Sequence, residues 1–119
     1  MRFTAMAVQL TSLLAGLFLI SVSASAQITP LGDAYTNTAD STTNYGAATT
    51  LAVDGAKEIT YIQFNLASIP SAATISQATL KLYVNSVTTA GSFNVDYIGS
   101  SWSESTIDAS NAPPLGATA

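Results

Sequence analysis

Three runs of this chain alternate between apolar and polar residues, and this alternation constrains the fold more than any other feature of the sequence. The runs are EITYIQFNL at 58–66, ATLKLYV at 78–84 and SFNVDYI at 92–98. A period of two gives a strand one apolar and one polar face, whereas a helix requires a period near 3.6. Residues 33–37 and 50–54 show two weaker patterns of the same kind. The sequence therefore predicts an all-β fold, and we expect an antiparallel sandwich rather than a barrel.

The apolar faces of these runs define the predicted core. The sequence SVTTAGSF, which contains Gly91, is expected to join the last two runs as a hairpin. Pairing the apolar faces of that hairpin would place Lys81 opposite or diagonal to Asp96. The predicted core residues are Leu51, Val53, Ile62, Phe64, Leu66, Leu80, Leu82, Val84, Phe93 and Val95.

The first 26 residues have the features of a secretory signal peptide. Arg2 is the one charged residue there, an apolar run follows from Ala5 to Val22, and the segment ends in Ala24-Ser25-Ala26. A basic start, an apolar middle and an A-x-A end predict cleavage after Ala26. The run is short and interrupted by polar residues for a transmembrane anchor, which needs about 20 apolar residues. We therefore expect a signal peptide at 1–26 and a secreted module at 27–119, with no membrane contact after cleavage.

The composition excludes several classes of chemistry. The chain has no Cys and no His, so a Ser-His-Asp triad, a Cys-His pair and the usual zinc sites are ruled out. Residues 27–119 carry two lysines and seven carboxylates, a formal charge of −5, which disfavours nucleic acid and anionic membranes. A glycosidase with two carboxylates stays formally open, but no carboxylate stands in an apolar run that would raise its pKa. We therefore predict that the chain is not an enzyme.

Four oxygen-bearing side chains in or beside the early loops leave calcium as an inorganic option. Calcium binds carboxylate, amide and carbonyl oxygens. The four residues lack the dense spacing of an EF-hand loop, and the alternative is that they form Asx turns, which we prefer. The residues are Asp33, Asp40, Asn44 and Asp54. No cofactor is predicted.

The polar faces of the predicted strands suggest a sugar-binding surface. Tyrosine offers a flat amphipathic ring, and amide, ammonium and carboxylate groups hydrogen-bond to hydroxyls. The simpler alternative is that these residue types suit a solvated strand face. The candidate carbohydrate-binding residues are Tyr61, Gln63, Lys81, Tyr83, Asn94 and Asp96.

Five blocks in order resemble the DNRLRE-domain family, which is also classed as carbohydrate-binding module family 96. The blocks are DAYTN at 33–37, TNYGAATTLAVDG at 43–55, YIQFNLASIPSAATISQATLKLYV at 61–84, GSFNVDYIGSSWSEST at 91–106 and NAPPLG at 111–116. The resemblance implies a secreted β-sandwich of jelly-roll type, usually an accessory module of polysaccharide-degrading or cell-surface proteins. Alginate is a ligand known within the family. The resemblance also implies that the Asn-Tyr-Gly corner is structural.

The resemblance covers the N-terminal part of the family's module, so we expect a sandwich that is incomplete at its C-terminus. Such a sandwich would leave strand edges unpaired and several core residues partly exposed. The predicted function is a secreted, non-catalytic polysaccharide-binding module. The alternative is a structural or adhesive β-sandwich of the cell surface that has no sugar site.

Overall fold

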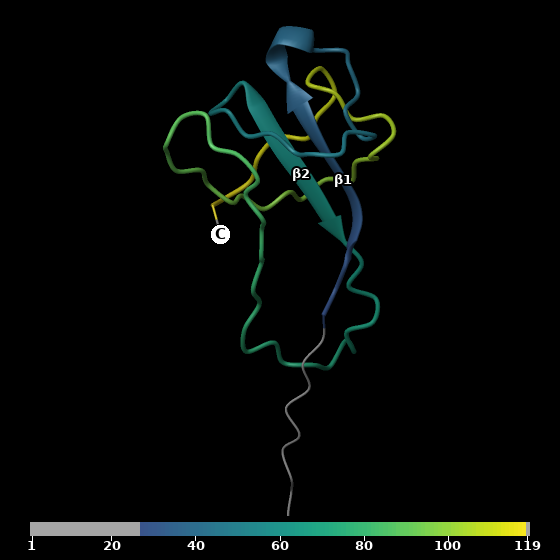
Figure 1. Ribbon diagram of the computed structural model, residues 1–119. Coiled ribbons are helices and arrows are strands. Elements are labelled where there is room, and N and C mark those ends of the chain that lie inside the picture. The colour runs from purple at the N-terminus through teal and green to yellow at the C-terminus, as the bar shows by residue number, and fades with distance from the viewer. Residues whose placement is uncertain (1–26, 119) are drawn as a thin grey trace, which may run out of the picture.

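The structure, a computed structural model, describes residues 27–118, and the predicted signal peptide lies outside the described residues. Strand β1 (Pro30–Asn37) is followed by a 3₁₀ turn, η1 (Thr38–Asp40), and by strand β2 (Glu58–Phe64). The two strands pair antiparallel in one sheet, as Figure 1 shows. Within residues 27–118 the regular structure is therefore strand apart from one short 3₁₀ turn, which agrees with the all-β prediction.

Local hydrogen bonds mark the residue where β1 ends and the turn after which β2 begins. Asn37 ends β1, and its side-chain oxygen accepts a hydrogen bond from the backbone N–H of Ala39 at 2.9 Å. Before β2, the chain reverses at Gly55, whose φ of 52° lies in the left-handed region that favours glycine. The backbone N–H of Lys57 closes this turn by donating to the carbonyl of Asp54 at 2.8 Å. The predicted strands at 33–37 and 58–66 are thus confirmed to within a few residues.

The core lies on one face of this sheet. Ala34 of β1 stands opposite Tyr61 of β2 in the register, and both are buried, as is Thr36. The irregular C-terminal segment, residues 98–118, covers this face with Ile107, which is 2% exposed. Burial of an isoleucine contributes about 1.5–3 kcal/mol, so Ile107 is a main anchor of this segment. The partly buried neighbours are Ile59, Ile98, Trp102 and Ala112.

The predicted core is wrong, because the sheet buries the opposite face of β2. Alternation puts Tyr61 on one face and Ile62 and Phe64 on the other, and the C-terminal segment covers the Tyr61 face. Ile62 and Phe64 are half-buried and border an open groove that residues 73–82 complete. The other eight predicted core residues are exposed, namely Leu51, Val53, Leu66, Leu80, Leu82, Val84, Phe93 and Val95. We expected several of the predicted core residues to be partly exposed, and most of them are.

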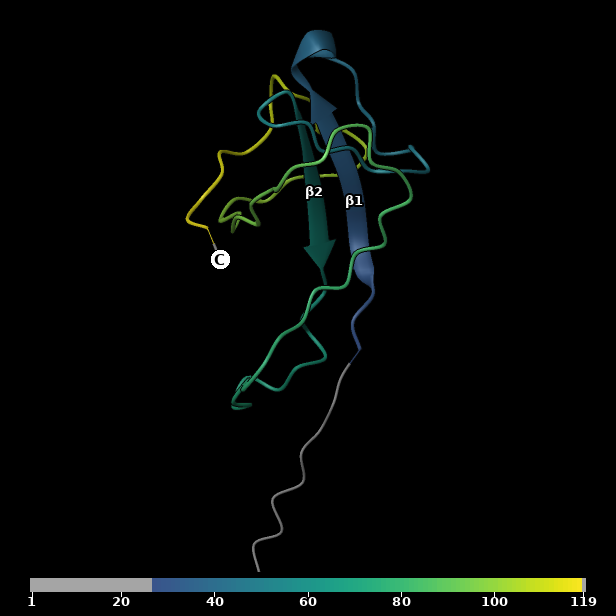
Figure 2. The ribbon, with the colours of Figure 1, turned by 60° about the vertical axis from the view of Figure 1, so that its left-hand side comes forward.

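The predictions of strands at 50–54, 78–84 and 92–98 are also wrong for the described residues. After β2 the chain leaves the sheet, runs below it and returns, which both views show (Figures 1 and 2). A strand needs a partner for its backbone groups, and among these segments 50–54 and 92–98 pair only through one isolated bridge each, Asp54 with Glu58 and Asp96 with Thr118, while 78–84 takes part in neither bridge. The predicted hairpin and the pairing of Lys81 with Asp96 are accordingly absent from residues 27–118, where the one ion pair found joins Lys57 to Asp54.

The carboxylate of Asp108, in the C-terminal segment, makes the stability of the fold depend on pH. One oxygen of Asp108 accepts hydrogen bonds from the Ser110 hydroxyl at 2.6 Å and from the backbone N–H groups of Ser110 and Asn111 at 2.8 and 3.1 Å. The Ser110 hydroxyl, helped by the two backbone N–H groups, lowers the pKa of Asp108 below its ordinary value of 3.8. A carboxylate whose pKa falls on folding stabilises the fold above its unfolded pKa, and this contribution is lost as the pH falls through the folded pKa.

We therefore expect the melting temperature of Asp108→Asn to be lower than that of the wild type at neutral pH. The difference should shrink below pH 3.8 as the wild-type carboxylate becomes protonated. Melting temperatures measured from pH 7 down to about pH 2 check this. A difference that stays constant over that range would contradict it.

Candidate functional site

Tyr61 was predicted to stack against a sugar, but its ring is buried and does not lie on an exposed face. It is 4% exposed, and its ring packs edge-on against Trp102 with centroids 5.9 Å apart. Its hydroxyl donates to the carbonyl of Pro113 at 3.4 Å, and burial raises the pKa of Tyr61. The register places Gln63 on the same face, opposite Gly32 and half-buried.

The other candidate residues lie in the irregular segment after β2. Tyr83 is 93% exposed, and Lys81 and Asn94 are exposed as well. Asp96 is half-buried and forms an isolated bridge with Thr118. Its Oδ1 is buried and has no hydrogen-bond partner within the described part of the chain. The expected face that carries both Tyr61 and Tyr83 is therefore not formed, because one ring is buried and the other is solvated.

The Asn-Tyr-Gly corner fastens two distant segments together. The Asn44 side-chain amide donates to the carbonyls of Glu104 and Ile107 at 2.8 and 2.7 Å, and its oxygen accepts from the Gly46 N–H at 3.2 Å. Asn44 therefore forms the predicted Asx turn and also holds the C-terminal segment. Glu104 in turn accepts a hydrogen bond from the backbone N–H of Asp33 at 3.3 Å. The interpretation of this corner as structural agrees with these contacts.

The tyrosine of this corner stacks on a tyrosine of β1. The rings of Tyr35 and Tyr45 are 4.3 Å apart between centroids and 20° from parallel. The Tyr45 hydroxyl donates to Oδ2 of Asp40 at 3.2 Å, and desolvation together with the Asp40 charge raises the pKa of Tyr45. Tyr35 was not among the predicted site residues. In β1 it alternates with Ala34 and Thr36, which point to the opposite, buried face. This alternation is the signal in the sequence that could have identified Tyr35.

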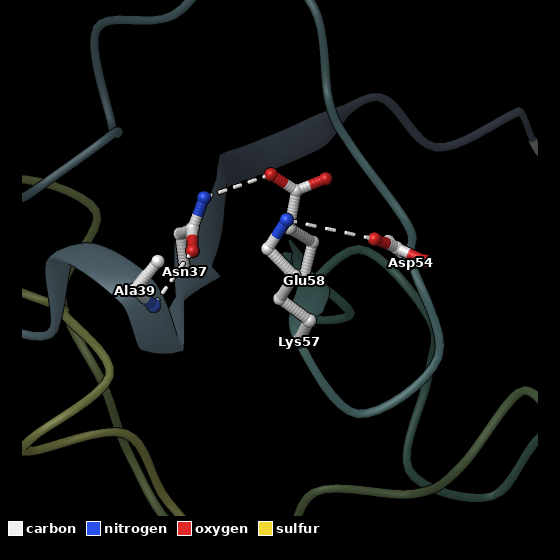
Figure 3. A network of polar contacts seen from close by, with 5 residues as sticks. All are labelled: Asn37, Ala39, Asp54, Lys57 and Glu58. Atoms are coloured by element: carbon white, nitrogen blue, oxygen red, sulfur yellow. Dashed lines mark hydrogen bonds and ion pairs between the residues drawn. The ribbon is translucent and has the colours of Figure 1, made fainter. Parts of the chain in front are cut away.

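Polar side chains gather at the same end of the sheet. The Asn37 amide donates to Oε1 of Glu58 at 2.8 Å, and the Lys57 ammonium lies 3.9 Å from Oδ2 of Asp54 (Figure 3). Asn37 and Glu58 stand opposite each other in the register, on the face that also carries Tyr35. We call Tyr35, Asn37, Asp40, Tyr45 and Glu58 the tyrosine platform. It combines flat rings with hydrogen-bonding groups, as a surface for polyhydroxylated ligands requires.

Two negative findings hold for residues 27–118. No group of three or more Asp and Glu side chains in this part of the chain is arranged to hold a metal ion. Within the same residues, no helix has the length and apolar character needed to cross a membrane.

The described part of the chain is a small antiparallel β unit whose tyrosine platform presents aromatic, amide and carboxylate groups, which can contact the C–H face and the hydroxyls of a sugar. Carbohydrate-binding module family 96 matches residues 24–119, and the chain belongs to this family. The match confirms the resemblance to the DNRLRE-domain type. No curated protein and no solved structure matches the chain.

Proposed function

We propose that the chain is a secreted, non-catalytic module that binds a polysaccharide. The observation that supports this most strongly is the family match across residues 24–119. The basic start, apolar run and A-x-A end of residues 1–26 support secretion. The lack of His and Cys supports a binding role over catalysis, because it excludes the common nucleophile and base pairs. We further propose that residues 27–119 belong to a jelly-roll-type sandwich.

We keep five side chains as the proposed contacts to sugar. One is Gln63 of β2, and the segment after β2 contributes Lys81, Tyr83, Asn94 and Asp96. The high exposure of Tyr83 supports this, because an exposed ring can stack against the C–H face of a sugar without moving another side chain. Tyr61 is withdrawn from this set because its ring is buried.

Affinity electrophoresis of the full chain in gels that contain single polysaccharides tests the proposed function. We expect retardation by at least one of mannan, laminarin, hydroxyethylcellulose and alginate, and normal mobility in a gel without polysaccharide. A chain that no polysaccharide of this set or of a broader glycan array retains would overturn the proposal in favour of a structural or adhesive role.

We expect a neutral polysaccharide to retard the chain more than alginate does. Residues 27–119 carry a formal charge of −5, and a uronate polymer is itself negatively charged, so long-range repulsion opposes binding at low salt. Electrophoresis at low and high ionic strength checks this. Clear retardation by alginate that disappears in Lys81→Ala would contradict it.

A further inference from the structure

The stacked rings of Tyr35 and Tyr45 provide a surface that is ready for contact with a sugar. One face of each ring lies against the other ring, with the centroids 4.3 Å apart, and both side chains are half-buried. Tyr35 belongs to β1, whereas Tyr45 comes from the irregular segment between η1 and β2, so the pair joins the sheet to that segment. An aromatic ring that is held flat and partly open to solvent can accept the apolar C–H face of a pyranose.

The groups around these rings are mainly hydrogen-bond acceptors. Asp40 accepts from the Tyr45 hydroxyl through Oδ2, and Glu58 accepts from Asn37 through Oε1. Each carboxylate therefore has a second oxygen, and a carboxylate oxygen accepts hydrogen bonds from sugar hydroxyls. The charge of Glu58 is close enough to Tyr45 to contribute to its raised pKa, after desolvation and Asp40. This acceptor-rich surface suits a neutral sugar and repels a carboxylated one.

Hydrogen bonds from the backbone and from the Asn44 side chain hold the platform in place before any ligand arrives. The N–H of Thr38 donates to the carbonyl of Lys57 at 3.0 Å, which ties η1 to the turn before β2. Asn44, next to Tyr45, is bonded to the carbonyls of Glu104 and Ile107. A surface whose groups are already ordered loses less conformational entropy on binding.

From these contacts we infer that the tyrosine platform is a second contact site for the polysaccharide, one that takes a neutral pyranose residue. The sugar stacks its C–H face on the outer face of Tyr45, and its hydroxyls donate to Asp40 and Glu58. This inference rests on the proposed function. It adds a site on the β1–β2 sheet that is separate from the segment carrying Lys81 and Tyr83.

Aromatic ¹H–¹³C NMR spectra of the full chain provide the first test, because they need no variant that could misfold. The probe is whichever of mannan, laminarin and hydroxyethylcellulose gives the strongest retardation. Comparison with Tyr45→Phe and Tyr35→Phe assigns the two sets of ring resonances. We expect the Tyr45 ring resonances to shift on titration, whereas those of the buried Tyr61 stay in place. A titration that saturates another site and leaves the Tyr45 ring unchanged overturns the inference.

Affinity measurements on variants provide the second test. Tyr45→Ala removes the ring, and we expect about a tenfold loss of affinity, the size of one lost stacking contact. Tyr45→Phe keeps the ring and should bind more tightly than Tyr45→Ala. Tyr97→Ala removes another exposed tyrosine and is the matched control, with affinity unchanged. Equal binding by the wild type and Tyr45→Ala overturns the inference while the proposed function stands. Absence of binding by the wild type to every polysaccharide overturns the proposed function itself.

Discussion

Gly46→Ala is expected to lower the free energy of unfolding by about 3 kcal/mol, the upper end of the usual cost of overpacking. A Cβ at this position would overlap the backbone carbonyl oxygen of Glu104 and lie 2.7 Å from its carbonyl carbon. The obstacle is backbone, which cannot rotate away as a long side chain can. Relief of the overlap would separate the corner from Glu104 and would strain the hydrogen bonds that the Asn44 amide donates to the carbonyls of Glu104 and Ile107.

Urea unfolding followed by circular dichroism measures this effect, and Gly91→Ala is the matched control. A Cβ at Gly91 would meet nothing within 4 Å, and Gly91 does not have a positive φ. We therefore expect the control to change stability by less than about 0.5 kcal/mol, as is usual for surface substitutions. Equal stability of the two variants would show that Gly46 and Glu104 do not pack as closely as described.

The sequence predicts the existence of the central strands but not which face they bury. Alternation is clear in 58–64, yet both faces of that run carry large apolar or aromatic side chains, with Ile59 and Tyr61 on one and Ile62 and Phe64 on the other. A period of two cannot choose between two such faces. The choice is made by Ile107 and its neighbours, which lie in a segment without periodicity, so no local pattern could reveal it.

The runs at 78–84 and 92–98 show a second limit of pattern reading. Their alternation predicts strands, but a strand forms only where another strand completes its ladder, and that partner is a property of the whole fold. The Asx turn at Asn44 was predictable from its residue type, and the structural role of the corner was implied by the family resemblance. The stacking of Tyr35 on Tyr45 was not, because it joins a strand to an irregular segment, and sequence spacing carries no information on such a contact.

Ile107→Ala is expected to destabilise the fold by about 2–5 kcal/mol, the range for truncating a buried isoleucine to alanine. Ile107 is 2% exposed and fills the space between the β1–β2 face and the C-terminal segment, where the fully buried apolar cluster consists otherwise of Ala34 and Tyr61. Domains of this kind are stable by only about 5–15 kcal/mol, so this loss is a large fraction of the total. Detachment of the segment would also uncover Trp102, which packs against Tyr61.

The single tryptophan of the chain makes this detachment visible. We expect the fluorescence of Trp102 in Ile107→Ala to shift to longer wavelength at denaturant concentrations where the wild type is still folded. Leu82→Ala is the control, because Leu82 is 49% exposed and its truncation leaves no enclosed cavity. If both variants unfolded at the same denaturant concentration as the wild type, Ile107 would not be the anchor of the C-terminal segment. If Leu82→Ala were the more damaging of the two, the core would lie on the Ile62 face of β2, and the face assigned to Tyr61 would be wrong.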